Sequence, residues 1–291
     1  MRMPKKITVS VIIPVYNEQK VIEKTIDAVK KSIKKSSVSS YEIIVVDDGS
    51  KDKSGRIIDS ITGIKAFHHQ INKGYGASIK TGIRNSRYEW ILILDADGTY
   101  PIQDIPKLVA ETNGNDMVVG ARVGKNVSIP LMRKSAKYIL RKVVKILAGV
   151  EVPDLNSGFR IFKKELALQF WNMFPDGFSF TTTITVASLT NGYAVKYMPI
   201  NYYKRTGKSS INPIMDFIKF NFLIFRIVLY FAPLKFFTPV SIAIMILAIL
   251  RGYRDFLVVD HIGDLALALV FVSVQIFFFG LLADLINKRM R

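Results

Sequence analysis

The sequence predicts an α/β protein built on a mostly parallel sheet, followed by a segment that associates with a membrane. From Ile7 to about Gly120, short apolar runs alternate with amphipathic stretches of helical period, and this order produces a parallel sheet with right-handed crossovers. After Ser210 the composition changes sharply to long apolar stretches. With 291 residues, 49% of them hydrophobic, the chain can bury a large core, which excludes disorder as its main state.

The central strand is the clearest element. Trp90–Leu94 is a run of five large apolar residues, too short for a typical helix, which indicates a strand buried on both faces. The helix expected at 18–34 carries Val21, Ile22, Ile26, Val29 and Ile33 on one side. In chain order the expected elements are a strand at Ile7–Ile13, a helix at Glu18–Lys34, a strand at Tyr41–Val46, a short helix at Ile57–Ile61, a strand at Lys65–His68, a helix at Ala77–Arg84, the strand at Trp90–Leu94 and a last strand at Met117–Val119.

Polar groups follow three of these strands. Pro14–Glu18 follows the first, Asp47–Ser50 the second, and Asp95–Asp97 the central one. Because the carboxyl ends of parallel strands meet at one edge of a sheet, these groups should face one crevice that suits a nucleotide. Tyr16 would stack on a base, the aspartates after the second strand would accept hydrogen bonds from the base or ribose, and Asp97 would hold Mg²⁺ or Mn²⁺ against the diphosphate. The alternative is that the aspartate-rich segments are only tight turns and helix caps.

Two other features carry less weight. Asn72–Ala77 is a glycine-containing start of a helix, of the kind that brings backbone close to a ligand. His68 and His69 are adjacent on a strand end and point to opposite faces, so we expect satisfied surface histidines rather than a metal site, and His261 lies in a loop.

Taken together, these motifs resemble an inverting family 2 glycosyltransferase of GT-A fold. The resemblance rests on Val11–Glu18, Asp47–Ser50, Asn72–Gly76 and Asp95–Asp97. Further segments are similar to the dolichyl-phosphate mannose synthase branch, which makes polyprenyl-phosphate sugars: Gly120–Arg122, Arg133, Asn156–Arg160 and Arg205–Ser209. The resemblance covers about residues 7–210 and implies transfer of one hexose from a nucleotide sugar (GDP-mannose or UDP-glucose type) to a polyisoprenyl phosphate such as dolichyl or undecaprenyl phosphate.

The resemblance also implies roles for individual residues. Asp97, with Asp95, would bind the metal, Mg²⁺ or Mn²⁺, and the catalytic residues would be Asp97, Arg122 and Arg133. The acceptor phosphate would be held by Arg122, Arg133 and Arg160. The donor would contact Pro14, Tyr16, Glu18, Asp47, Asp48, Asp95, Ala96, Asp97, Arg122, Arg205 and Lys208.

The chain departs from the family pattern at two places. Thr99 stands where a glutamine often helps to bind the metal, and Ser210 stands where the usual Gly-x-Ser-Lys motif has its final lysine, with Lys208 as the candidate substitute. An anionic lipid phosphate needs positioning rather than a general base, and guanidinium groups can supply it. The alternative for the arginines is a solvated basic face.

Two other functions remain open. A processive polysaccharide synthase of the same family would share the aspartate motifs, but its Gln-x-x-Arg-Trp signature does not occur in this sequence. A non-catalytic membrane scaffold could keep the fold alone.

The domain organisation expected is a catalytic domain at 1–210, an amphipathic interfacial helix at 211–233 and a transmembrane hairpin at 234–291, with spans at about 234–250 and 265–286. Lysines and arginines flank the hairpin on both outer sides, which predicts a multi-pass protein of the cell membrane with a cytoplasmic catalytic domain. The net charge of +18 then serves attraction to an anionic leaflet, and no motif indicates nucleic acid. The absence of cysteine fits a reducing compartment, and a homo-oligomer is compatible with the sequence.

Overall fold

The computed structural model describes residues 6–123, 142, 144–145, 149–177, 179–203, 222, 225–226 and 229–289. The chain divides into two compact units, Met1–Pro213 and Ile214–Arg291. The predicted interfacial helix at 211–233 lies largely outside the described residues.

The first unit is a seven-stranded sheet with helices on both faces. Its strand order is β3-β2-β1-β4-β6-β5-β7, and only β6 runs antiparallel to its neighbours. The prediction of a mostly parallel α/β fold is therefore confirmed. The elements are β1 (Ile7–Val15), α1 (Ile22–Lys34), β2 (Val38–Asp47), α2 (Ser54–Ser60), β3 (Lys65–His68), α3 (Tyr75–Arg84), β4 (Trp90–Ile93), η1 (Ile102–Asp104), α4 (Ile105–Ala110), β5 (Met117–Ala121), β6 (Arg160–Lys163), α6 (Lys164–Gln169), η2 (Trp171–Met173), α7 (Phe180–Thr190) and β7 (Val195–Pro199).

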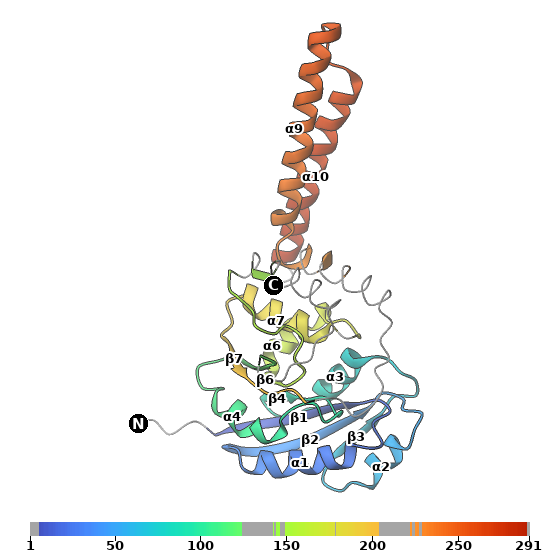
Figure 1. Cartoon of the computed structure of the whole chain (residues 1–291), viewed down its shortest axis with the longest axis vertical. Coiled ribbons are helices and arrows are strands. Elements are labelled where there is room, and N and C mark those ends of the chain that lie inside the picture. The colour runs from blue at the N-terminus through green and yellow to red at the C-terminus, as the bar shows by residue number, and fades with distance from the viewer. Residues whose placement is uncertain are drawn as a thin grey trace. The chain divides into compact units, whose positions relative to one another are not determined.

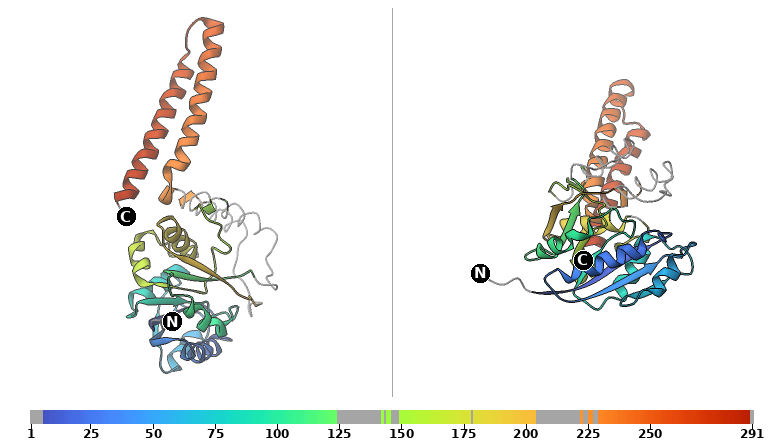
Figure 2. Two further views of the ribbon diagram at one scale, coloured as in Figure 1. Left: turned by 90° about the vertical axis from the view of Figure 1, so that its left-hand side faces the viewer. Right: turned by 60° about the horizontal axis from the view of Figure 1, so that its bottom comes forward.

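Alternating residues of the central strands supply the two faces of the core. Helices α1, α2 and α4 cover one face, and α3, α6 and α7 cover the other (Figures 1 and 2). On the first face, Val11 and Ile13 of β1 join Ile26 and Val29 of α1 in one buried cluster. On the opposite face, Gly82 of α3 lies so close to β1 that an added Cβ would be 2.4 Å from Ile12. The missing side chain therefore allows α3 to pack tightly on the sheet.

The order of the strands creates a switch point between β1 and β4. The chain proceeds from β1 to β2 and β3 on one side and returns to place β4 on the other side of β1, with all four strands parallel. The connections from β1 and to β4 lie on opposite sides of this point, which leaves a crevice at the carboxyl ends of the two strands. Ligands bind in crevices of this kind in open α/β sheets. The first and central strands therefore end beside it.

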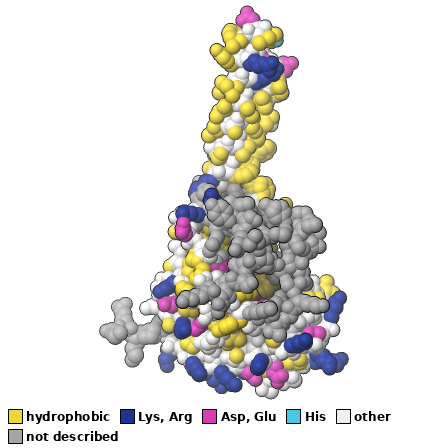
Figure 3. All heavy atoms as spheres, in the orientation of Figure 1, with side chains coloured by type: hydrophobic (Ala, Val, Ile, Leu, Met, Phe, Trp, Pro, Cys, Tyr) yellow, Lys and Arg dark blue, Asp and Glu magenta, His cyan; other side chains and the backbone are white. Residues whose placement is uncertain are grey.

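The second unit contains two long apolar helices, α9 (Pro233–Val259) and α10 (Asp264–Arg289). Each is long and apolar enough to cross a membrane, with an 18-residue stretch of mean hydropathy 2.0 within Pro233–Val259 and one of 2.6 within Asp264–Asn287. Apolar side chains cover most of the hairpin surface, and charged ones gather near the turn (Figure 3). Helix α9 continues beyond the predicted end of the first span at about 250 to Val259, and it carries Arg251 and Asp255 as an i,i+4 ion pair of 3.1 Å.

A buried carboxylate of β2 links this strand to its two neighbours, β1 and β3. Glu42 of β2 is 8% exposed and accepts hydrogen bonds from Ser10 Oγ of β1 at 2.6 Å and from the Arg87 N–H at 2.8 Å. Lys65 Nζ of β3 lies 2.7 Å from its other oxygen. Burial opposes ionisation of this carboxyl, but the hydrogen bonds outweigh it and hold the pKa of Glu42 below its ordinary value.

We expect Glu42→Gln to lower the free energy of unfolding by about 1 to 3 kcal/mol at pH 7, because the amide loses charge-assisted contacts inside the protein. Since the folded pKa of Glu42 is depressed, its contribution is present above the ordinary value of 4.5 and is lost as the pH falls through the folded pKa. Urea unfolding followed by tryptophan fluorescence at pH 7 and below pH 4 measures this. If the free energy of unfolding differed between wild type and variant by the same amount at both pH values, the stabilising role of the ionised Glu42 carboxylate would be contradicted.

Candidate active site

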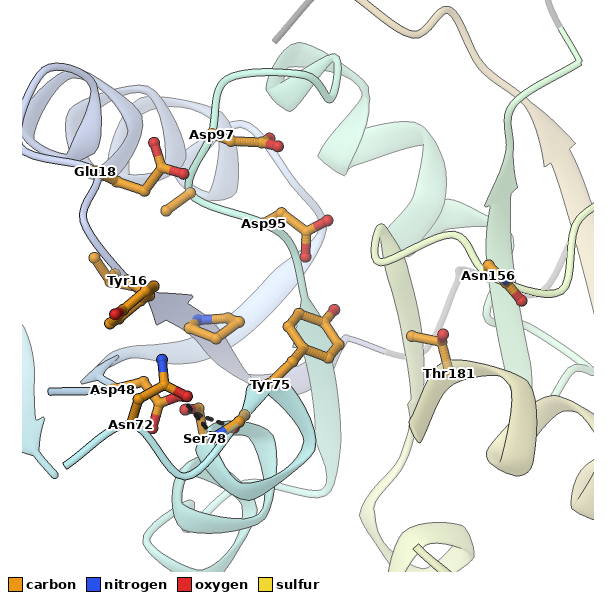
Figure 4. Close-up of a pocket in the computed structure, with 14 residues that line it drawn as sticks. Tyr16, Glu18, Asp48, Asn72, Tyr75, Ser78, Asp95, Asp97, Asn156 and Thr181 are labelled. Atoms are coloured by element: carbon orange, nitrogen blue, oxygen red, sulfur yellow. Dashed lines mark hydrogen bonds between the residues drawn. The ribbon is translucent and has the colours of Figure 1, made fainter. Parts of the chain in front are cut away.

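A cavity of about 310 Å³ opens at the carboxyl edge of the sheet, beside the switch point. Residues that follow β1 and β4 line it together with the start of α3 and the loop before β6 (Figure 4). In that view Tyr16, Asp48 and Asn72 lie on one side, Asn156 and Thr181 lie on the other, and Asp95 and Tyr75 lie between them. The lining residues are Pro14, Val15, Tyr16, Glu18, Asp48, Asn72, Gly74, Tyr75, Ser78, Asp95, Ala96, Asp97, Asn156 and Thr181.

The loops after β1 and β2 hold each other in place. Asn17 donates its N–H to Ser50 Oγ at 2.9 Å and accepts the Lys51 N–H at 2.8 Å through its side chain. Asn17 has a φ of 57°, a left-handed conformation that asparagine tolerates better than most residues. The Glu18 N–H donates to Ser54 Oγ at 2.9 Å. These bonds fix the segment that presents Tyr16 beside the turn that presents Asp48.

The two aspartates after β2 have different surroundings. Asp48 lines the cavity and accepts the backbone N–H groups of Lys73 and Gly74 at 2.9 and 2.8 Å. Asp47 does not line it: its carboxylate accepts the Ser50 N–H at 3.1 Å and contacts His68 Nδ1 at 3.1 Å. Asp47 therefore stabilises the turn behind the cavity, and only Asp48 is placed to meet a ligand.

Both histidines belong to this network: His68 is a satisfied surface group, as we expected, whereas the side chain of His69 is buried. His68 contacts Asp47 and Asp59, and His69 contacts Asp48 at 2.7 Å. Burial disfavours the imidazolium of His68, but the two carboxylates outweigh it and hold the pKa of His68 above its ordinary value. The side chain of His69 is only 7% exposed.

Asp95 lies among buried aromatic groups. Burial together with the charge of Asp95 raises the pKa of the Tyr75 hydroxyl well above its ordinary value. Tyr100 OH accepts the Gly158 N–H at 2.7 Å. A Cβ at Gly158 would stand 2.6 Å from Asp95 Oδ1, so only glycine lets this loop reach the carboxylate.

Asp97 follows two residues later and is oriented by its own turn. Its Oδ1 accepts the Thr99 hydroxyl at 2.6 Å and the Thr99 N–H at 3.1 Å. Within the described ranges, no group of three or more His, Cys, Asp or Glu side chains is arranged to hold a metal ion. Two carboxylates in one cavity nevertheless fit Mg²⁺ or Mn²⁺, because hard cations prefer oxygen ligands and Mg²⁺ commonly takes few carboxylates and completes its shell with substrate phosphates and water.

The glycines at the start of α3 make a close packing contact in addition to the approach to the cavity, which Gly74 lines. We predicted a close approach of backbone to a ligand at Asn72–Ala77. A Cβ at Gly74 would lie 2.6 Å from the Asp176 carbonyl oxygen, and one at Gly76 would lie 2.2 Å from that of Pro175. The Ala77 N–H donates to the Asp176 carbonyl at 2.9 Å. The glycines therefore pack α3 against the loop before α7.

The predicted phosphate-binding arginines divide into three cases. Arg122 makes a bidentate pair with Asp154 at 2.7 and 2.9 Å and does not line the cavity, so any contact of this guanidinium with a substrate would have to be shared with Asp154. Arg160 is 0% exposed and donates to the carbonyls of Leu155, Ser157 and Thr181 and to the Thr185 hydroxyl. The prediction that it holds an acceptor phosphate is wrong for this structure, because the guanidinium is enclosed by protein acceptors. Arg133, Arg205 and Lys208 lie outside the described residues.

Sequence reasoning assigned no individual role to seven of the lining residues: Val15, Asn72, Gly74, Tyr75, Ser78, Asn156 and Thr181. Tyr75 and Asn156 stand inside motifs that the sequence singled out, yet only the fold brings them to the cavity. Thr181 comes from the first turn of α7, a helix that the sequence did not predict, and its neighbour Thr182 donates to Asn156 Oδ1 at 2.6 Å. The run of three threonines, Thr181–Thr183, was the sequence feature that could have indicated a polar lining at this place.

The sheet order and the carboxylate-lined edge are those expected of a GT-A fold. The model of glycosyl transferase family 2 matches residues 10–171, more than half of the chain, and the chain therefore belongs to this family. The model of the GtrB C-terminal hairpin matches residues 232–288, which contain most of α9 and α10.

Named relatives and solved structures agree with this assignment. The dolichyl-phosphate beta-glucosyltransferase of Dictyostelium discoideum is 27% identical over 246 residues, which cover 74% of each chain. The undecaprenyl-phosphate 4-deoxy-4-formamido-L-arabinose transferase of Proteus mirabilis is 31% identical over 163 residues, 54% of this chain and 49% of that one. A crystal structure of glucosyl-3-phosphoglycerate synthase from Mycobacterium tuberculosis with Mn²⁺ and UDP-glucose has a TM-score of 0.58 at 16% identity and covers 76% of this chain and 78% of that chain. At 16% identity this structural similarity supports the shared fold alone.

We expect Gly158→Ala to weaken nucleotide binding by about tenfold or more, because the added Cβ collides with Asp95 inside the cavity and displaces a carboxylate held by buried contacts. Gly177→Ala is the matched control, since a Cβ there meets nothing within 4 Å. Calorimetric titration with UDP and GDP in the presence of Mn²⁺ measures the effect. Equal affinities for the two variants, with both folded by circular dichroism, would contradict the role given to this close contact.

Proposed function

We propose that this protein transfers a single hexose from a nucleotide sugar, of UDP-glucose or GDP-mannose type, to a polyisoprenyl phosphate, with inversion at the anomeric carbon. The observation that carries the proposal is the cavity at the switch point, where an aromatic ring, Asp48 and the Asp95–Asp97 pair share one opening. The named relatives act on dolichyl and undecaprenyl phosphates, and the GtrB hairpin model matches the C-terminal part of the chain. Membrane attachment suits an acceptor of that class.

The donor would bind with its base on the Tyr16 side of the cavity. Tyr16 is 37% exposed, which leaves its ring available for stacking, and Asp48 accepts hydrogen bonds, as a base with a ring N–H requires. The diphosphate would then lie toward Asp97, and Asp97 with Asp95 would hold Mg²⁺ or Mn²⁺. A bound divalent ion stabilises the charge that develops on the departing diphosphate.

The acceptor would enter with its phosphate already anionic. In the transfer, an oxygen of the lipid phosphate forms a bond to C1 of the hexose while the bond from C1 to the diphosphate oxygen breaks, and the nucleoside diphosphate leaves. No proton has to be removed from the nucleophile. The protein therefore has to position the lipid phosphate against C1 and exclude water, and it does not have to supply a base. Arg133, Arg205 and Lys208 remain predicted phosphate contacts.

The hairpin would keep the active site at the membrane surface. A polyprenyl tail cannot leave the bilayer without exposing a large apolar surface to water, so the enzyme must work at headgroup depth. We propose that α9 and α10 span the membrane and that the catalytic unit faces the cytoplasm, because Lys and Arg flank the hairpin on both outer sides.

A transfer assay tests the proposal directly. The full-length protein in nanodiscs is incubated with radiolabelled UDP-glucose or GDP-mannose, Mn²⁺, and undecaprenyl or dolichyl phosphate. We expect label to pass into the organic phase as a lipid that contains one sugar. Label in a long polysaccharide would favour a processive synthase instead. The absence of transfer and of donor hydrolysis across a panel of nucleotide sugars would favour the non-catalytic scaffold.

We expect Asp97→Asn to reduce transfer by at least about a hundredfold while the fold is kept, because the amide is a far weaker ligand for a hard cation. Thr99→Val should have a smaller effect, since it removes the hydroxyl that orients Asp97 but keeps the Thr99 N–H bond. Mn²⁺ titration of activity, with direct Mn²⁺ binding followed by electron paramagnetic resonance, separates the two. Full activity of the wild type in excess EDTA would refute the metal assignment.

A further inference from the structure

His69 contacts Asp48, a residue that lines the cavity, but does not line the cavity itself. It follows β3, and its backbone N–H donates to the Asp47 carbonyl at 2.8 Å. Its Nδ1 is 2.7 Å from Asp48 Oδ1, and its Nε2 is 2.9 Å from Thr81 Oγ1 in α3. The side chains of His69 and Asp48 are only 7% and 5% exposed. The imidazole therefore bridges a cavity residue and a helix that packs on the sheet.

The hydrogen-bond roles in this bridge follow from chemistry. An ionised carboxylate can only accept, so Nδ1 must carry the proton that faces Asp48. The Thr81 hydroxyl can donate to a neutral Nε2 or accept from a charged one, so it satisfies the ring in either state. The carboxylate of Asp48 thus receives three donors from the protein in the described part of the chain: His69, Lys73 N–H and Gly74 N–H.

These donors are unevenly distributed over the two oxygens. Oδ1 accepts both His69 and the Lys73 N–H, whereas among the described residues Oδ2 accepts one bond, from the Gly74 N–H. A carboxylate oxygen has two acceptor sites, so Oδ2 can take one more donor. His69 and Lys73 fix the rotation of the carboxylate about its last bond, and this rotation decides where the second site of Oδ2 points.

We propose that His69 is a positioning residue for donor recognition. Anchored by Thr81, it fixes Asp48 so that the carboxylate receives a ring N–H of the nucleobase. This inference rests on the proposed function. A fixed carboxylate accepts the ring N–H of uracil or guanine and has nothing to accept from the corresponding ring nitrogen of cytosine or adenine, which is itself an acceptor. His69 therefore contributes to discrimination among bases without touching the donor.

Two amide substitutions separate the two ends of the imidazole. In His69→Asn the side-chain NH₂ stands near the place of Nδ1 and can still donate to Asp48. In His69→Gln the amide reaches instead toward the place of Nε2 and Thr81, so the contact to Asp48 is lost. Thr81→Val removes the anchor and keeps the imidazole. The probes are UDP against CDP and GDP against ADP, titrated by calorimetry with Mn²⁺ into the full-length protein in detergent.

We expect His69→Gln to weaken binding of the preferred nucleotide by about tenfold, the size of one lost charge-assisted hydrogen bond, and to reduce its preference over CDP or ADP by a similar factor. His69→Asn should stay within about threefold of the wild type, and Thr81→Val should lie between the two. In the transfer assay the KM for the donor should rise with His69→Gln, while kcat at saturating donor and the KM for the lipid should change little.

Three results would overturn the inference: His69→Gln with unchanged base preference, His69→Asn as impaired as His69→Gln, or an equal loss of affinity for all four nucleotides. Circular dichroism and the unfolding midpoint identify a variant that is merely misfolded, and Thr81→Val then carries the test. Asp48→Asn distinguishes a failure of the proposed base site from a failure of the role given to His69. If it leaves nucleotide binding unchanged, the proposed base site itself fails; if it weakens binding but the His69 variants do not, only the role of His69 fails.

Discussion

The parallel pairing of β1 with both β2 and β4 is the constraint on which the rest of the catalytic unit depends. The register places Val15 opposite Asp47 and Ile12 opposite Ile93, so the residues that follow all three strands emerge at one edge. No single loop in this protein carries the site. Tyr16, Asp48 and Asp95 meet because three buried strands end together, and hydrogen bonds hold the loops after β1 and β2 to one another.

Buried polar contacts give this edge its rigidity. Each of the three cavity aspartates has a defined set of neighbours: backbone N–H groups and an imidazole at Asp48, a tyrosine at Asp95, and the Thr99 hydroxyl and N–H at Asp97. Groups held in this way lose little further freedom when a ligand binds, which is the physical meaning of preorganisation. The Thr99 contact also gives a reason for the departure from the family pattern, since a short hydroxyl can orient Asp97 without being a metal ligand itself.

The sequence could predict those parts of the molecule that follow from local pattern. Strands β1, β2, β3 and β4 and helices α1 and α3 were expected close to their positions, because apolar runs and helical periods are local signals. Strands β6 and β7 were not predicted. Strand β6 is four residues long and begins with Arg160, whose burial depends on carbonyl groups from other segments and cannot be recognised in the sequence. The same limit applies to His69, whose partners Asp48 and Thr81 lie 21 and 12 residues away.

The central claim is that a nucleotide sugar lies across the carboxyl edge with its base at Asp48 and its diphosphate at Asp97. The most direct test is a cryo-electron microscopy structure of the full-length protein in nanodiscs with Mn²⁺ and the tighter-binding of UDP and GDP. The account predicts the base between Tyr16 and Asp48, with a ring N–H directed at the Asp48 carboxylate, and the metal between the diphosphate and Asp97. A base against Asn156 and Thr181, or a nucleotide bound outside this cavity, would contradict it.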